Sequence, residues 1–148
     1  MIVAAAGMGF LLAVLWFDLM FDVQVWPYRH DAATIPDAVV DSIATYYRRV
    51  TTEAHPMSRL VALAMLVTLA SLIAAGVRDG GWAPWIALAL VVPPIAYAGA
   101  SIVPAAVRLG SRRDDLPTQQ RLARAILLGH LACWCSVFAA LLVTLIGA

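Results

Sequence analysis

The sequence contains few charged residues and no lysine. Of its 148 residues, 13% are charged and 63% are hydrophobic, whereas about a quarter of the residues in a soluble domain are charged. Such a chain cannot cover its apolar surface in water, so a soluble globular protein is excluded and a lipid environment is expected. All ten basic residues are arginines, and the formal net charge of +1 gives no indication of nucleic-acid binding.

Several motifs of common enzyme sites are also absent. The sequence has no CxxC pair, no glycine-rich phosphate loop and no nucleophile elbow. Its two cysteines, Cys133 and Cys135, are two residues apart, and on a helix such side chains point about 200° apart. They therefore cannot form a disulfide or chelate one metal ion, and we interpret both as small apolar residues.

Four long, almost uncharged runs are present instead. Each has close to the roughly 20 apolar residues that cross a bilayer as a helix, and none shows the alternation of barrel strands. The sequence therefore predicts an all-α fold, an integral membrane four-helix bundle that forms a single transmembrane domain over residues 1–148. The predicted spans are about 1–22, 58–77, 82–104 and 125–147.

The arginines predict the orientation of the bundle. Nine of the ten lie in two segments, 22–59 and 105–124. Because basic loops stay on the cytoplasmic side, we expect both segments in the cytoplasm and both termini on the outer side of a bacterial cytoplasmic (inner) membrane, in a multi-pass protein. The first run has no basic segment before it, so we expect a retained helix rather than a signal peptide.

The first cytoplasmic loop contains an amphipathic pattern. Residues 34–37, with the sequence TIPD, are typical of a helix start, because they combine a capping hydroxyl, an early proline and an acid. We predict an amphipathic helix over about 35–53. Its apolar stripe can pack on the protein's own bundle or on a partner, and the sequence leaves both alternatives open. The stripe comprises Ile35, Val39, Ile43, Tyr46 and Val50.

Ionisable residues gather near the predicted cytoplasmic boundary. Asp18 and Asp22 end the first span and share one helix face, where they would repel unless a positive group lies beside them. Ionisable groups inside a membrane usually face the interior and pair. One interpretation is therefore a set of structural ion pairs between these two acids and Arg59, Arg108 or Arg124.

A second interpretation is a cofactor site. Carboxylates and imidazoles bind transition metals, and an imidazole can also be the axial ligand of haem. The metal-ligand candidates are Asp18, Asp22, His55 and His130, and the cofactor-binding candidates for haem are His55 and His130. Against a metal, no HxxxH or ExxH pair lies on one helix. A third interpretation is a role in proton transfer or quinone chemistry, and no catalytic residue is identified.

One family is similar in the arrangement of these features. The chain has a long first cytoplasmic loop that ends in SIATYYRRVTTEAHPMSRL, then Pro104 and Arg108 after the third span, and Arg121 and Arg124 before His130. In this it resembles the anthrone-oxygenase-like family of small four-helix bacterial membrane proteins, over most of its topology but with few identical residues. The asparagine-rich stretch and the tryptophans of that family are missing. The haem-binding protoporphyrinogen oxidases are a more distant likeness, and their helix-one histidine is missing here.

Two hypotheses on function follow. The first is an accessory, structural subunit of a larger bacterial energy-transducing membrane complex, respiratory or photosynthetic, that takes part in electron transport without enzymatic activity of its own. Its partners would be other membrane protein subunits and bound lipids, not nucleic acid, with Trp26, Tyr28, Trp82 and Trp85 as interfacial anchors. The second is a small membrane oxidoreductase, or a metal- or haem-binding protein, that uses the Asp/His cluster at the cytoplasmic end of the bundle.

Overall fold

Helices make up every regular element that the structure describes. The computed structural model describes residues 1–30 and 34–147, without the side chain of His55. The all-helical class predicted from the sequence is confirmed for this part of the chain. In chain order the elements are α1 (Ile2–Asp22), the 3-10 helix η1 (Val23–Tyr28), α2 (Asp37–Arg48), the π-helix η2 (Arg49–Glu53), α3 (His55–Asp79), α4 (Ala83–Tyr97), the π-helix η3 (Ala98–Ile102), α5 (Val103–Ser111) and α6 (Leu116–Ile146).

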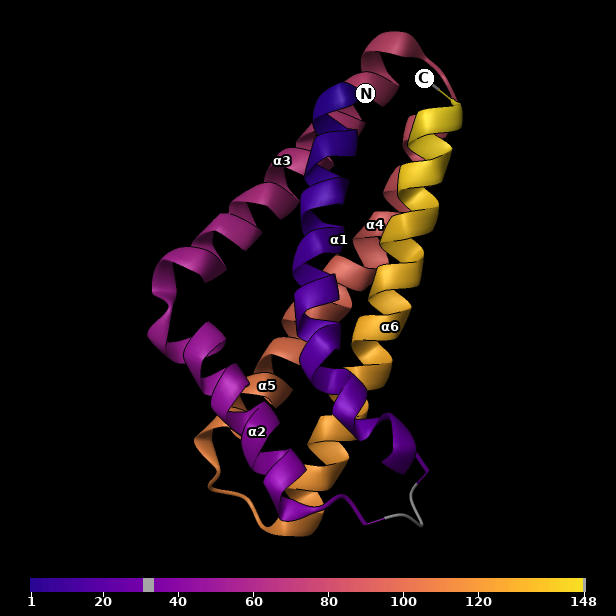
Figure 1. Cartoon of the computed structure of the whole chain (residues 1–148). Coiled ribbons are helices and arrows are strands. Elements are labelled where there is room, and N and C mark those ends of the chain that lie inside the picture. The colour runs from indigo at the N-terminus through magenta and orange to yellow at the C-terminus, as the bar shows by residue number, and fades with distance from the viewer. Residues whose placement is uncertain (31–33, 148) are drawn as a thin grey trace.

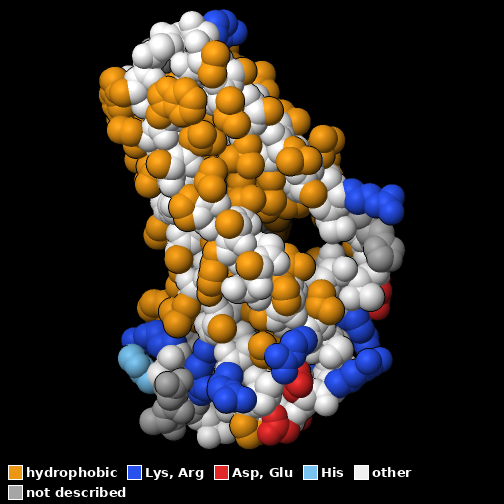
Figure 2. All heavy atoms as spheres, turned by 180° about the vertical axis from the view of Figure 1, so that it is seen from behind, with side chains coloured by type: hydrophobic (Ala, Val, Ile, Leu, Met, Phe, Trp, Pro, Cys, Tyr) orange, Lys and Arg blue, Asp and Glu red, His pale blue; other side chains and the backbone are white. Residues whose placement is uncertain are grey.

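Four helical stretches are long and apolar enough to cross a membrane. They are Ile2–Tyr28, Pro56–Asp79, Ala83–Ser111 and Leu116–Ile146. Both chain ends and the α3–α4 turn lie at one end of the bundle, and α2 with the α5–α6 turn lies at the other (Figure 1). Figure 2 shows apolar side chains over much of the visible face, and most of the charged side chains gathered at its lower end.

Helix α6 begins at Leu116, before the fourth membrane span that the sequence predicts from about residue 125. Asp115 caps it, because its carboxylate accepts a hydrogen bond of 3.2 Å from the backbone N–H of Thr118, and Pro117 fits the first turn. Hydrogen bonding from the Thr118 side chain, and then from its backbone N–H, holds the pKa of Asp115 below its usual value. The polar segment before the fourth span is therefore mostly helix.

Two adjacent prolines interrupt the hydrogen bonds of α4. Pro94 has no N–H, so the carbonyl of Leu90 lacks its usual helical donor. The hydroxyl of Ser136, on α6, donates to that carbonyl oxygen at 2.7 Å. Directly after α4 the chain continues as the wider π-helix η3. A side chain of the neighbouring helix thus satisfies a backbone group that proline leaves without a partner.

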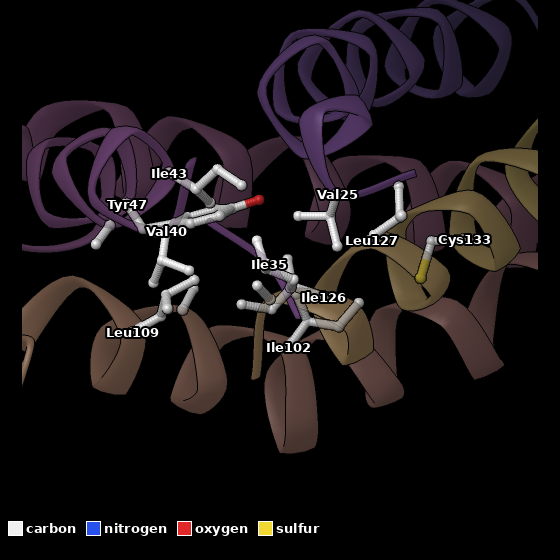
Figure 3. Packing of buried hydrophobic residues seen from close by; sticks show 13 residues of the cluster. Val25, Ile35, Val40, Ile43, Tyr47, Ile102, Leu109, Ile126, Leu127 and Cys133 are labelled. Carbon is white, nitrogen blue, oxygen red and sulfur yellow. The ribbon is translucent and has the colours of Figure 1, made fainter. Parts of the chain in front are cut away.

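Helix α2 packs on α5 and α6 at the charged end of the bundle. Figure 3 shows Val40, Ile43 and Tyr47 of α2 facing residues of these helices, among them Leu109 and Ile126. The side chains of Val40 and Ile43 are fully buried there. The buried face of α2, which shares Ile43 with the predicted stripe, therefore packs on the protein's own bundle.

Backbone and charge contacts bring α2 close to its neighbours. A Cβ on Gly110 would lie 2.7 Å from the backbone nitrogen of Arg48, so only glycine fits there. Arg112 has a left-handed φ of 53°. Its guanidinium lies 2.9 Å from a carboxylate oxygen of Asp37 and 2.6 Å from one of Asp41. These contacts fix the position of α2 against the loop after α5.

The buried face of α2 is rotated from the predicted stripe. Adjacent apolar pairs at 39–40 and 46–47 give two faces the same helical spacing, so spacing alone cannot choose between them. Ile35 and Ile43 are buried as predicted, whereas Val39, Tyr46 and Val50 are only partly buried. The fully buried residues of α2 are Val40, Ile43, Ala44 and Tyr47.

Candidate functional site

A buried hydrogen-bonded cluster joins α1, α2 and α6. His130 Nδ1 lies 2.7 Å from Asp22 Oδ2, and the hydroxyl of Tyr47 donates to Asp22 Oδ1 at 2.7 Å. All three side chains are buried, with exposed fractions of 5% or less. Both hydrogen bonds end on the Asp22 carboxylate, so this arrangement fits the tautomer in which Nδ1 donates and Nε2 is an acceptor.

Asp18 lies one turn before Asp22 on α1 and has its own tyrosine. The hydroxyl of Tyr46 donates to Asp18 Oδ1 at 2.7 Å, and the Tyr46 ring stacks on Phe21 with 3.9 Å between ring centroids. Asp18 Oδ2 is 3.9 Å from His130 Nε2, which is too long for a direct hydrogen bond. His130 therefore lies between the two acids, where their mutual repulsion led us to expect a basic group.

Burial keeps the two phenols of α2 protonated. It raises the pKa of Tyr46 above its ordinary value, and the nearby Asp18 carboxyl raises it further. Burial raises the pKa of Tyr47 in the same way, with Asp22 as the second cause. An ordinary tyrosine has a pKa of about 10, so both hydroxyls act as hydrogen-bond donors at neutral pH.

A large cavity opens beside Asp18, between α1, α3 and the segment where α4 becomes η3. Its volume is about 790 Å³, within the usual range for small-molecule sites. Asp18 is the only acidic or basic residue among its described lining residues, and most of the others are apolar. A smaller pocket of about 130 Å³ also borders Asp18 and reaches His130. Figure 2 shows a hollow on the α3 side of the molecule.

The sequence suggested three arginines as ion-pair partners of Asp18 and Asp22, and the structure gives them other surroundings. Arg108 is paired with Asp114 at 3.0 Å, and Arg124 Nε donates to the carbonyl oxygen of Tyr28 at 2.7 Å. Arg59 is exposed near the start of α3. Among the described residues, the hydrogen-bond and ion-pair partners of the two acids are Tyr46, Tyr47 and His130 instead.

The structure describes the side chains of Asp18, Asp22 and His130 among the candidate metal and haem ligands, but not that of His55. His55 begins α3, but its side chain lies outside the described part of the chain, so any site that needs it stays a prediction. In the residues that the structure does describe, no three His, Cys, Asp or Glu side chains form a group suited to a metal ion. Haem ligation by His130 Nε2 stays a prediction, and the Asp18 carboxyl lies 3.9 Å from this nitrogen.

The sequence did not identify the tyrosines as partners of the acids. Only the regular spacing of Val40, Ile43 and Tyr47 could have indicated that Tyr47 is buried. Cys133 is buried and Cys135 exposed, both as free thiols, as expected for residues on different helix faces. Comparison of the chain with family models, curated proteins and solved structures finds no match.

Proposed function

We propose that this chain is a small membrane enzyme that binds a lipid-soluble molecule in the cavity beside Asp18 and exchanges a proton with it at His130. One observation carries the proposal: a buried imidazole, held by a carboxylate, borders a small pocket that shares Asp18 in its lining with an apolar cavity of about 790 Å³. Of the hypotheses drawn from the sequence, this corresponds to the small membrane oxidoreductase.

The cluster has the parts of a general base. His130 Nε2 accepts the proton, and Asp22 holds the ring through Nδ1 and stabilises the imidazolium that forms. Tyr47 fixes the Asp22 carboxylate by its own hydrogen bond. The apolar lining of the cavity excludes water, which strengthens each of these interactions.

In this proposal α2 is an amphipathic helix at the cytoplasmic interface, and both termini lie outside. The support is the arginine distribution, together with the exposed Trp82 and Trp85 near the opposite end. Ser42 is exposed on α2. In a variant without Cys133 and Cys135, a cysteine at position 42 should react with a membrane-impermeant thiol reagent only after cells are opened. Labelling of intact cells would reverse the orientation.

The proposed function predicts that the purified chain retains a bound lipid-soluble molecule. Native mass spectrometry of the chain alone should detect one lipid-soluble molecule per protein. Gly99→Phe places a ring in the cavity and should remove it, because Gly99 lines the cavity and a Cβ there meets nothing within 4 Å. Ala100→Phe is the matched control, since Ala100 is exposed and not part of the lining.

The possible results of this experiment either support or contradict the proposed function. Equal retention in Gly99→Phe and wild type, or no bound molecule in either, would contradict the proposal. The melting temperatures of both variants, measured without added ligand, verify that the fold is intact. The visible spectrum and metal content of the same sample test the metal and haem hypotheses directly.

The accessory-subunit hypothesis has lost one of its supports. It offered the apolar stripe of the loop helix to a partner, and the structure shows that Ile43 is covered by the chain's own helices. Membership of a larger energy-transducing complex stays a prediction, as does the resemblance to the anthrone-oxygenase-like family.

A further inference from the structure

Asp18 Oδ2 and His130 Nε2 lie 3.9 Å apart, and these two polar atoms could bind a polar group beside a cavity whose lining is mostly apolar. We propose that the occupant is a neutral, lipid-soluble alcohol whose hydroxyl group lies between Asp18 Oδ2 and His130 Nε2. This inference rests on the proposed function and names the substrate class of the same site.

The distance between the two polar atoms fits one bridging oxygen. They are 3.9 Å apart and belong to residues that border the same small pocket. An oxygen about 2.8 Å from each completes two ordinary hydrogen bonds. A polar separation of this size in a protein is commonly bridged by a third group.

The protonation of His130 selects the kind of oxygen. With Nδ1 donating to Asp22, Nε2 is left as an acceptor that is buried and needs a donor. A hydroxyl donates to Nε2 and can also accept from Asp18 when that carboxyl is protonated. A ketone or an ether oxygen only accepts, so neither can satisfy Nε2.

Charge excludes the other common lipid headgroups. The described lining of the cavity contains no arginine, so a carboxylate or phosphate would lie beside Asp18 without a compensating cation. An ammonium group would find a carboxyl but would lose its hydration in an apolar cavity, at a large free-energy cost. A hydroxyl is neutral, so its burial needs only the two hydrogen bonds that this gap offers.

The test compares molecules with the same chain and different headgroups. Dodecanol, dodecyl methyl ether, dodecylamine and dodecanoate are equilibrated by dialysis between nanodiscs that contain the protein and empty nanodiscs of the same lipid. Wild-type protein should retain dodecanol about 10- to 100-fold more strongly than the ether, because the ether leaves the buried Nε2 without a donor. Asp18→Leu should reduce the retention of dodecanol about tenfold by removing one partner of the hydroxyl.

Thr51→Val is the matched control. Thr51 lines the same cavity, but its hydroxyl already donates to the carbonyl of Tyr47 at 2.6 Å, so the preference for dodecanol should be unchanged. Equal retention of alcohol and ether by wild type would overturn the inference and indicate that water fills the gap. Stronger retention of the amine or the carboxylate would also overturn it.

The two proposals fail in different ways. If alcohol and ether are retained equally and both are lost in Gly99→Phe, the cavity binds lipid-soluble molecules without selecting a hydroxyl. If no probe is retained by wild type, the proposed function itself is wrong.

Discussion

Replacing Asp22 with alanine is expected to lower the free energy of unfolding by about 2–6 kcal/mol, because each of the two buried donors that lose their acceptor costs about 1–3 kcal/mol. The substitution leaves His130 Nδ1 and the Tyr47 hydroxyl without their acceptor, at positions that water does not reach. The measurement is reversible unfolding in detergent micelles. Tyr47→Phe should have a smaller effect, about 1–3 kcal/mol, because it removes one hydrogen bond and keeps the packing.

Asp79→Ala is the matched control for Asp22. Asp79 is also an aspartate near the end of a predicted span, but it is exposed and paired with the neighbouring Arg78. Exposed pairs contribute little, so no measurable change is expected. A loss of stability in Asp22→Ala no larger than that of this control would show that the buried cluster does not hold α1, α2 and α6 together.

The double substitution Val39→Asp and Ile43→Asp is expected to detach α2 from its own bundle. Ile43 is fully buried against α5 and α6. Loss of an isoleucine side chain from a core costs about 2–5 kcal/mol, and a carboxyl group left there without a partner adds to this cost. We expect faster proteolysis in the segment 34–54 and a lower melting temperature for the purified chain.

The control places the same two charges on the outer face of α2. Ala38 and Thr45 are both exposed, so Ala38→Asp with Thr45→Asp should leave proteolysis and melting unchanged. A partner that covers the stripe would give another result: the purified chain would melt like wild type, and only its co-purification with other subunits would fall. That result would restore the accessory-subunit hypothesis.

The sequence predicted the number and order of the membrane-spanning helices because long apolar runs between charges have few other solutions. It also placed Asp18, Asp22 and His130 at a common depth, and the structure brings these three together. It did not predict their tyrosine partners. The side that α2 presents to the bundle depends on a rotation of the helix, and adjacent apolar pairs leave that rotation undecided.

The arginines that the sequence suggested as partners of Asp18 and Asp22 were chosen by their depth in the membrane. Arg108 and Arg124 are close to the acids in depth, but each has a nearer partner, in Asp114 and in the carbonyl of Tyr28. Depth along a helix can be counted from the sequence, whereas direction around the helix depends on packing. The cavity was also not foreseen, because it arises where α3 diverges from the bundle (Figure 1).

The hydrogen bond between Asp22 and His130 has a consequence for how the protein is made. Its two residues are 108 positions apart in the chain, one on the first helix and one on the last. During synthesis the first three helices exist before His130 has been translated, so Asp22 has no imidazole partner until the end. A chain that stops before α6 therefore lacks the histidine partner of a carboxyl group that the finished protein buries.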